Sequence, residues 1–225
     1  MIVNISESDL EAAAKVGLPR EKLTVIRNGI CTEPPRNAVP ILFDQSKINV
    51  LFVGRHDPQK GLDLLISAMR LLAGVPVHLH VLGSPIVSTG TGLDKLSPNV
   101  TFYGWVQRDQ VSAYIGAADA VIVPSRWEGF GLVAIEAMRM ARPVIASKCG
   151  GLAEIVIDGE TGVLFPPDNS QAIVETLKSL DPARLRSMRP LALERFKQNF
   201  TASRMNTQLL DLYESLTRTQ VANGL

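Results

Sequence analysis

The chain has 225 residues, of which 46% are hydrophobic and 20% charged, and its formal net charge at pH 7 is +1. That length supports one good core with appendages, and the charge balance does not indicate a protein that binds nucleic acid or a membrane surface. The two cysteines, Cys31 and Cys149, lack metal-ligand spacing and are interpreted as reduced thiols of a cytoplasmic protein. No apolar run is long enough for a transmembrane segment, and the N-terminus does not resemble a signal peptide.

Residues 1–47 predict a leader that precedes the main domain. They contain one short helix and one short strand, expected at Glu7–Val16 and Leu23–Ile26. The strand is followed by Asn28-Gly29, which is a strong turn signal. Residues 31–47 are rich in proline and predict a linker or a surface excursion.

From Ile48 onwards, short apolar runs alternate with helical patterns. The expected strands are Ile48–Val53, Val77–Leu82, Val100–Tyr103, Ala120–Val123, Pro143–Ala146 and Gly162–Phe165. The expected helices are Leu62–Leu72, Arg108–Ala117, a buried helix after Gly131, Leu152–Ile157, Asn169–Leu180, Pro182–Gln198 and Thr201–Thr217. Strands that are apolar throughout and separated by helices predict an α/β fold, with a doubly wound parallel sheet. Ligands of such folds bind beyond the carboxyl ends of the strands.

The loop after the first of these strands places two cations at such an end. Arg55 and Lys60 suit a diphosphate, the first as a bidentate fork and the second as a point charge. The helix that begins at Gly61 or Leu62 adds backbone N–H groups, which favours an anion site over two solvated loop cations.

The stretch Pro124–Met138 predicts a second anion-binding turn between a buried strand and a helix. Gly129 and Gly131 allow the backbone to approach a phosphate or sugar, although a tight turn without a ligand has the same pattern. Trp127 and Phe130 either line a pocket or serve packing alone.

Glu136 is the unusual residue of the helix that follows, because its neighbours leave almost no polar face. A charge there needs hydrogen bonds, which come either from the hydroxyls of a ligand or from Arg139 or Arg142. Gly150-Gly151 and Glu154 form a weaker candidate for a third turn at the same cleft.

Several other chemistries lack their motifs. His56, His78 and His80 form no ligand set, and the last two are expected to be structural. No Asp-x-Asp occurs, so a metal clamp on a diphosphate is not expected. The patterns for nicotinamide dinucleotides, Walker loops and hydrolase elbows are also missing.

In their order and spacing, these motifs resemble the donor-binding, C-terminal half of the retaining glycosyltransferases of family four, which have the two-domain B-type fold. The resemblance is strongest at two glutamates with seven residues between them, Glu128 and Glu136. Its other motifs are Ser6-Glu7, Ile26-Arg27-Asn28-Gly29, Val53-Gly54-Arg55, Lys60-Gly61, Phe102–Val106, Pro124-Ser125, Glu128–Gly131, Glu136–Met138, Pro143–Ala146, Gly150-Gly151, Glu154 and Asp158–Gly162.

The resemblance implies three parts of the chain. Residues 1–47 resemble the tail of an N-terminal acceptor domain that is missing here. Residues 48–200 would form a Rossmann-like domain that binds a nucleotide sugar, and residues 201–225 a helix that packs back on the acceptor domain. The chain departs from the family's pattern at Gly83-Ser84-Pro85 and at Ala141, where a glycine is usual and where alanine is unfavourable for a left-handed cap.

The resemblance also implies the roles of site residues. Arg55, Lys60 and Glu128 would be catalytic: the cations hold the diphosphate and Glu128 contacts the transferred sugar. Glu136 would accept hydrogen bonds from the ribose hydroxyls, and the loop near Val106 would pack on the base. The remaining donor-binding residues would be Gly54, Gly129, Phe130, Gly131 and Leu132.

The implied function is retaining transfer of a hexose from a nucleoside-diphosphate sugar to a saccharide or lipid-linked acceptor. No metal or other cofactor is implied, and the enzyme would be cytoplasmic or peripheral to a membrane through its missing half. One alternative is a nucleotide-sugar binding module, or a partner subunit, with no transfer activity of its own. A third hypothesis is another enzyme of the B-type fold, such as a nucleotide-sugar epimerase.

Overall fold

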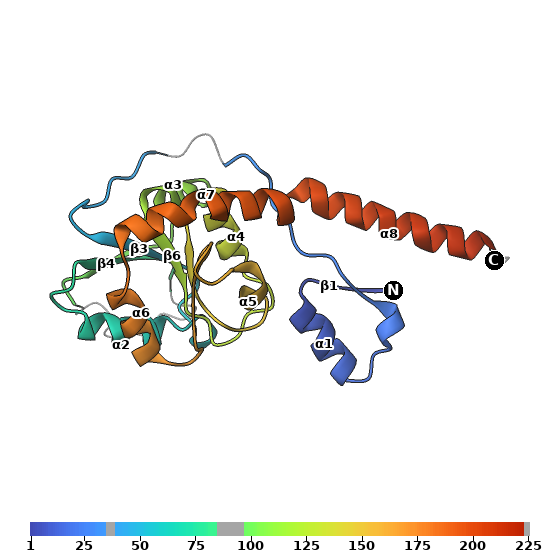
Figure 1. Ribbon diagram of the computed structural model, residues 1–225, viewed down its shortest axis with the longest axis horizontal. Helices are drawn as coiled ribbons and strands as arrows, with labels where there is room; N and C mark the ends of the chain where they lie inside the picture. Colours follow the sequence, from blue (N-terminus) through green and yellow to red (C-terminus); the bar gives the residue numbers. More distant parts are fainter. Residues whose placement is uncertain (35–38, 85–96, 223–225) are drawn as a thin grey trace.

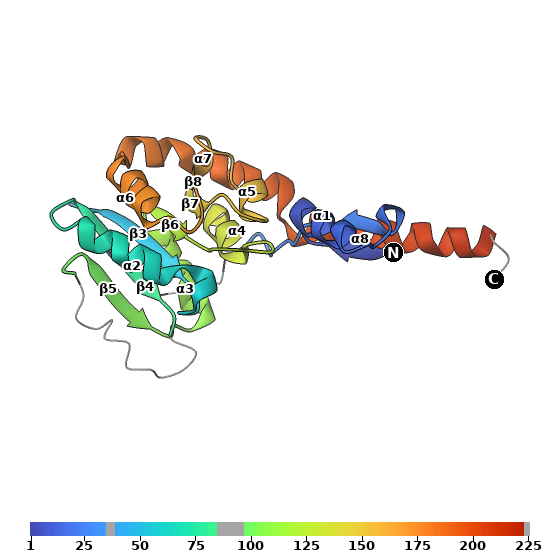
Figure 2. The ribbon, with the colours of Figure 1, turned by 90° about the horizontal axis from the view of Figure 1, so that it is seen from below.

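A computed structural model of the protein describes residues 1–34, 39–84 and 97–222, with side chains described up to residue 218. The described chain forms a small N-terminal unit, a larger α/β domain and a long C-terminal helix, α8 (Ala202–Ala222), that leaves the domain (Figures 1 and 2). No described helix is both long and apolar enough to cross a membrane.

The core of the large domain is a sheet of six parallel strands in the order β5-β4-β3-β6-β7-β8. These strands are β3 (Ile48–Val53), β4 (Val77–Leu82), β5 (Val100–Gly104), β6 (Ala120–Val123), β7 (Val144–Ser147) and β8 (Gly162–Phe165). The pairing of β3 with β4 runs without a break from Ile48 opposite Val77 to Val53 opposite Leu82. The predicted parallel sheet is confirmed, and its strands lie within two residues of the predicted bounds.

Helices cover both faces of this sheet. Helices α2 (Leu62–Leu71) and α6 (Ser170–Lys178) pack together over one face, where Val50 and Phe52 of β3 are buried. The other face carries α3 (Arg108–Ala117), α4 (Leu132–Arg139), α5 (Leu152–Ile155) and part of α7 (Pro182–Asn199). Leu51 points into that second cluster, so adjacent residues of one strand serve opposite faces. This two-sided burial explains why the strands are apolar without alternation.

Strand order determines where a ligand would meet the sheet. From β3 the chain moves outward through β4 and β5, then returns to the other side of β3 and continues through β6, β7 and β8. The loops after β3 and β6 therefore diverge from the same point, which is the switch point where ligands of open α/β sheets bind.

Helix α4 ends in a left-handed residue, although that residue is alanine. Ala141 has φ 52°, and its backbone N–H donates to Met138 while the N–H of Arg142 donates to Ala137. This pair of bonds is a Schellman motif. Alanine is unfavourable in this conformation, as expected, but the cap forms nevertheless. Two backbone hydrogen bonds and a buried helix hold Ala141 in place.

The N-terminal unit consists of β1 (Ile2–Asn4), α1 (Glu7–Lys15), a 3-10 turn η1 (Arg20–Lys22) and β2 (Leu23–Val25). Its strands pair in parallel, with Ile2 opposite Leu23, and the unit lies beside the large domain in Figure 1. Beyond it, the described residues of 31–47 form no helix or strand. Phe43 of this segment is nevertheless buried and stacks on His80, with ring centroids 3.6 Å apart.

Candidate functional site

Three pockets adjoin one another at the carboxyl end of β3, and Val53 lines all three. Their volumes are about 610, 320 and 270 Å³. We name them by position: the α4 pocket (610 Å³) beside Glu136, the central pocket (320 Å³) beside Glu128, and the β4 pocket (270 Å³) beside Arg55. The three pockets lie where the sheet topology predicts a ligand.

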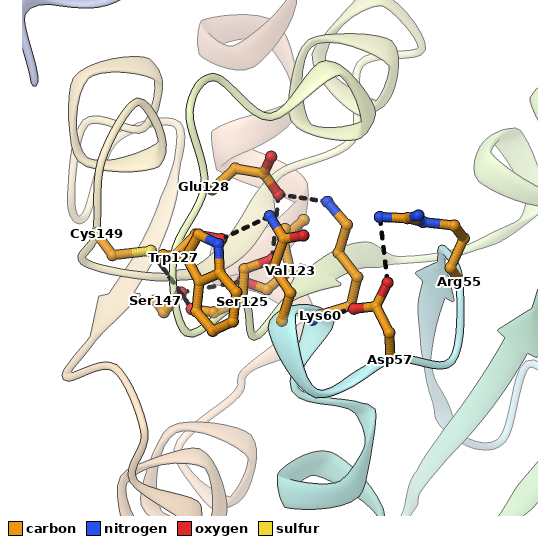
Figure 3. A network of polar contacts seen from close by, with 10 residues as sticks. Arg55, Asp57, Lys60, Val123, Ser125, Trp127, Glu128, Ser147 and Cys149 are labelled. Carbon is orange, nitrogen blue, oxygen red and sulfur yellow. Dashed lines mark hydrogen bonds and ion pairs between the residues drawn. The ribbon is translucent and has the colours of Figure 1, made fainter. Parts of the chain in front are cut away.

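The central pocket contains an ion pair between two predicted site residues. Lys60 Nζ donates to Glu128 Oε2 at 2.6 Å, and both side chains are largely buried. Ser125 Oγ also donates to Glu128 Oε2, at 3.2 Å. Figure 3 shows Lys60 extending from its loop toward Glu128, with Arg55 on the other side of Lys60. A charged pair in a partly buried position is held firmly only when further hydrogen bonds support it, and Ser125 supplies one.

The turn between β6 and α4 forms the floor of the same pocket. Gly129, Phe130, Gly131 and Leu132 all line it, and α4 begins there with Leu132. Since the first N–H groups of a helix have no partner within the helix, this turn presents donors suited to an anion. Phe130 is buried and packs edge-on against Phe200, so its main contact is with the core.

Glycine at position 150 fixes the main chain under Glu128. Gly150 has φ 44°, and a Cβ there would lie 1.9 Å from the carbonyl oxygen of Glu128. Only a glycine allows this approach. The next residue, Gly151, donates its N–H to the same carbonyl at 3.1 Å. The Gly150-Gly151 turn therefore holds the backbone of Glu128 in position. Neither glycine is part of the described lining of the three pockets.

The β4 pocket collects the predicted residues of the first loop and the base loop. Gly54, Arg55 and Val106 line it together with Ser84 and Trp105. Arg55 is 64% exposed and pairs with Asp57 at 3.2 Å, while Asp57 also caps the 3-10 turn η2 (Pro58–Lys60) by accepting from Lys60 N. The loop after β4 departs from the family pattern, and from Pro85 onward it lies outside the described residues.

Glu136 lines the α4 pocket together with Arg108 and Arg139. Within the described chain, its carboxylate accepts no hydrogen bond; Arg139 instead donates to Cys31 O and Ser112 Oγ. Burial raises the pKa of Glu136, and the charges of Arg139 and Arg108 offset part of that effect. Neither of the predicted protein partners donates to this carboxylate. Arg139 acts on it through its charge alone, and Arg142 donates to the carbonyl oxygen of Gly116.

Two predicted candidates lie away from the pockets. Trp127 is 58% exposed and is not part of the described pocket linings. The carboxylate of Glu154 accepts from the backbone N–H groups of Glu7 and Ser8, at 3.1 and 3.0 Å, and pairs with Arg27. Glu154 thus binds the first turn of α1, and its suggested place at the cleft was wrong because α5 directs it toward the N-terminal unit.

The histidines His78 and His80 have structural partners. His80 shares hydrogen bonds with Asn49 and the hydroxyl of Tyr103, and His78 with Thr101. Burial lowers the pKa of His80 to about 4. Within the described residues, no group of three or more His, Cys, Asp or Glu side chains is arranged to hold a metal.

Sequence reasoning missed several residues of the pockets. Val53 and Asn28 belong to motifs of the family resemblance, but neither was given a role at the site, yet Val53 lines all three pockets and Asn28 lines the central pocket. Arg108 stands at the start of a predicted helix, where nothing marks it as a pocket residue. Ser125, which contacts Glu128, belongs to the motif Pro124-Ser125. Asp57 lies between Arg55 and Lys60, and a carboxylate two residues from Arg55 is a signal that would have identified its partner.

Comparison with known proteins identifies the family. The model of a family described as "Glycosyl transferases group 1" matches residues 47–180, which is more than half of the chain. The chain belongs to this family. As a group 1 glycosyltransferase domain, it has the predicted Rossmann-like fold of the B-type enzymes.

Curated relatives of this glycosyltransferase domain are longer than the chain. An uncharacterized 41.2 kDa protein in the cps region of Klebsiella pneumoniae is 30% identical over 220 residues, covering 95% of this chain and 61% of the relative. A D-inositol 3-phosphate glycosyltransferase of Segniliparus rotundus is 39% identical over 162 residues, which cover 65% and 35% of the two chains. The chain therefore spans less than two thirds of the length of these relatives.

Solved structures of B-type enzymes have the same fold. Sucrose-phosphate synthase of Thermosynechococcus elongatus superposes with a TM-score of 0.81 at 30% identity, over 96% of this chain and 58% of the other. HepE of Anabaena, solved in complex with UDP and glucose, gives a TM-score of 0.80 at 23% identity, over 96% and 63%. The likeness to HepE shows the fold alone.

Proposed function

We propose that the chain is the donor-binding half of a glycosyltransferase and binds a nucleoside-diphosphate sugar across the three pockets. The observation that carries this proposal is that Val53 joins them into one site with three different chemistries. The central pocket offers an ammonium, a carboxylate and helix amides, the α4 pocket offers an acceptor carboxylate, and the β4 pocket offers Arg55 and a loop wall. A sugar diphosphate would need the groups of the central pocket and Arg55, a ribose would need the acceptor carboxylate, and a base would need the loop wall.

The comparisons support the class of donor. HepE has been solved in complex with UDP, with UDP-glucose, and with UDP and glucose. We infer that this chain takes the same class of ligand, with the diphosphate near Lys60 and Arg55 and the ribose at Glu136. The sugar would lie at Glu128 and at the turn from Gly129 to Leu132.

The proposed reaction is retaining transfer of a hexose. The bond between the anomeric carbon and the diphosphate oxygen breaks, and its electron pair leaves with the phosphate. Lys60, Arg55 and the amides at the start of α4 stabilise the charge that develops there. Glu128 faces the positive character that develops on the sugar. The acceptor hydroxyl forms the new bond on the same face and passes its proton to the departing phosphate oxygen. We propose that these cations and amides hold the diphosphate without a metal ion.

The acceptor would bind to a second domain. The chain spans less than two thirds of its relatives, and α1 and α8 lie at the end of the molecule away from β4 and β5 (Figure 2). We propose that a saccharide or lipid-linked acceptor is held by a second domain like the additional part of the longer relatives, and that the enzyme is cytoplasmic or, through that domain, peripheral to a membrane. The chain by itself would then bind the donor and transfer sugar at a negligible rate.

Calorimetric titration of the chain with UDP, GDP and ADP, each with and without EDTA, tests the donor site. We expect one of these nucleotides to bind and EDTA to leave its affinity unchanged. Binding of none of the three would contradict the proposed donor site, and efficient sugar transfer by the isolated chain would contradict the need for a second domain.

The second candidate is a binding module or partner subunit that never transfers sugar. The three pockets that it would use are all lined by residues of this chain. Adding a separately produced acceptor domain of a relative distinguishes the two: restored transfer supports the enzyme, and binding without transfer supports the module. An epimerase would instead convert the donor sugar without any acceptor.

A further inference from the structure

Arg126 connects the two loops that carry Lys60 and Glu128, and this role was not apparent from the sequence. Lys60 ends η2 in the loop after β3, and Glu128 lies in the loop after β6. Their contact at 2.6 Å therefore depends on how closely these two loops are held together.

The guanidinium of Arg126 binds three separate segments. Its Nη1 and Nη2 atoms donate to the two carboxylate oxygens of Asp63 at 2.9 and 2.7 Å, a bidentate pair with the first turn of α2. Nη1 also donates to the carbonyl of Pro58 at 2.5 Å, two residues before Lys60. Nε donates to Asp168 at 2.7 Å, in the loop after β8. Only the planar fork of arginine can make bonds in these directions at once.

Main-chain contacts continue the connection between the same loops. The N–H of Arg126 donates to the carbonyl of Gln59 at 2.8 Å, and the Gln59 amide donates to the carbonyl of Trp127 at 3.3 Å. Gly61 has φ 68°, and a Cβ there would lie 2.1 Å from the carbonyl oxygen of Pro124. The backbones of the two loops are therefore in direct contact, and the side chain of Arg126 adds hydrogen bonds between them.

Arg126 is well placed to position Lys60 and Glu128 without touching a ligand. It lies outside the described linings of the three pockets. Its hydrogen bond with Asp63 raises the pKa of Arg126, and the same bond lowers the pKa of Asp63, so the network is charged at neutral pH. Asp63 and Asp168 are 59% and 67% exposed, and exposed pairs contribute little to global stability. The network therefore fixes a local distance more than it supports the fold.

We propose that Arg126 is a positioning residue that sets the spacing of Lys60 and Glu128 and so prepares the central pocket for the diphosphate sugar. For its ligand, this inference rests on the proposed function. It goes beyond that function because Arg126 neither lines the pockets nor belongs to the residues implied by the family resemblance.

The first arm of the test needs no ligand. The rate at which an amine-reactive acylating reagent modifies Lys60 is measured by mass spectrometry in the parent chain and in Arg126→Lys, which keeps the charge but loses the fork. We expect the rate at Lys60 to rise several-fold and the rate at the exposed Lys178 to stay unchanged. Arg218→Lys, at an exposed pair with Glu214, is the matched control and should change neither rate. An unchanged rate at Lys60 in Arg126→Lys overturns the proposal.

The second arm measures UDP affinity in the parent, Arg126→Lys, Lys60→Ala and the double variant. If Arg126 acts through Lys60, Arg126→Lys lowers affinity about tenfold in the parent and less than twofold in the Lys60→Ala background. An equal loss in both backgrounds overturns the positioning role. A parent chain that binds no nucleotide contradicts the proposed function instead, and the acylation rates still decide whether Arg126 holds Lys60 in place.

Discussion

The Nζ atom of Lys60 lies 2.6 Å from Oε2 of Glu128, although the two residues are 68 positions apart in the chain. Both were predicted to act on the donor, the one on the diphosphate and the other on the sugar. Each neutralises the charge of the other, so a diphosphate bound as proposed would share Lys60 with a carboxylate. The pair would then be both a preformed site and a competitor for the ligand.

Substituting the carboxylate should separate these two effects. Glu128→Gln removes the charge that competes for Lys60 while Arg126 still holds the two loops together, so we expect the affinity for UDP to rise roughly fivefold, equivalent to about 1 kcal/mol. Lys60→Ala removes a charged hydrogen-bond donor and leaves Glu128 facing the phosphates, so affinity should fall about 10- to 100-fold. Calorimetry measures both. The variant Ser125→Ala, which removes the smaller contact with Glu128, serves as a control. A fall in UDP affinity in Glu128→Gln would contradict competition for Lys60.

Glu136 should make nucleotide binding depend on pH. Burial raises its pKa, and ribose hydroxyls that donate to it favour the ionised form. UDP affinity should therefore fall as the pH falls through this raised pKa. Glu136→Gln should bind more weakly and lack this part of the dependence, and subtracting its pH profile removes the titration of the nucleotide phosphate. Parallel profiles for the parent and Glu136→Gln would place the ribose elsewhere.

His80 should make the fold sensitive to acid. Its pKa is about 4 in the folded chain because burial disfavours the charged ring, against an ordinary value of 6.5. The unfolded chain therefore takes up the proton first, and the stability that neutral His80 provides above pH 6.5 is lost as the pH falls toward 4. We expect a loss of roughly 2–3 kcal/mol over that range. Urea unfolding at several pH values measures it.

A variant that cannot titrate gives the control for His80. His80→Gln should be less stable at pH 7 because it loses the stacking on Phe43, but its stability should fall less between pH 6.5 and 4. Burial lowers the pKa of His56 and His78 as well, so a smaller slope should remain. An identical slope in the parent and the variant would rule out His80 as the main cause.

Ala141→Gly should stabilise the protein, because Ala141 is held at φ 52° in the left-handed region. Relief of that conformation adds about 1 kcal/mol to the free energy of unfolding. Part of this gain is offset because glycine has more conformational entropy than alanine in the unfolded chain. Thermal unfolding should show a higher midpoint. Ala183→Gly, in the first turn of α7 with ordinary helical geometry, should lower the midpoint. A lower midpoint for both would mean that the Schellman motif tolerates alanine without strain.

Glu154→Gln should loosen the N-terminal unit while the large domain stays folded. The carboxylate accepts from the first N–H groups of α1 and pairs with Arg27, and the neutral amide weakens both interactions. Hydrogen exchange at the amides of Glu7 and Ser8 should speed up several-fold. Glu160→Gln, exposed in the same region, should leave these amides unchanged. Unchanged exchange in Glu154→Gln would show that other contacts hold α1.

The sheet could be predicted from sequence because its strands are buried on both faces. A strand such as Ile48–Val53 is a continuous apolar run with clear breaks, so periodicity and breakers define its ends. Their parallel order and the position of the site then follow from general rules of α/β folds. The family motifs added the grouping of Lys60, Glu128 and Glu136, whose side chains do line adjoining pockets.

The rest could not be predicted, because it depends on contacts between segments far apart in sequence. The pairing of Arg126 with Asp63 and Asp168 has no sequence signal, since each residue alone is indistinguishable from an ordinary exposed charge. Glu154 was placed at the cleft because its glycine turn follows a strand, but the direction of a side chain on a four-residue helix is set by packing. Phe43 is buried in the core, although it belongs to a proline-rich segment that was predicted to be a linker or a surface excursion.

At Gly61 and Gly150 the loops around the central pocket meet backbone against backbone. Such seams do not depend on the identity of the neighbouring side chains. Exposed pocket residues such as Trp105 and Ser84 are therefore open to exchange by an engineer who wants the pocket to take a different ligand, while the backbone around the central pocket remains unchanged. The same seams are the positions where a mutational library should find almost no tolerated replacement.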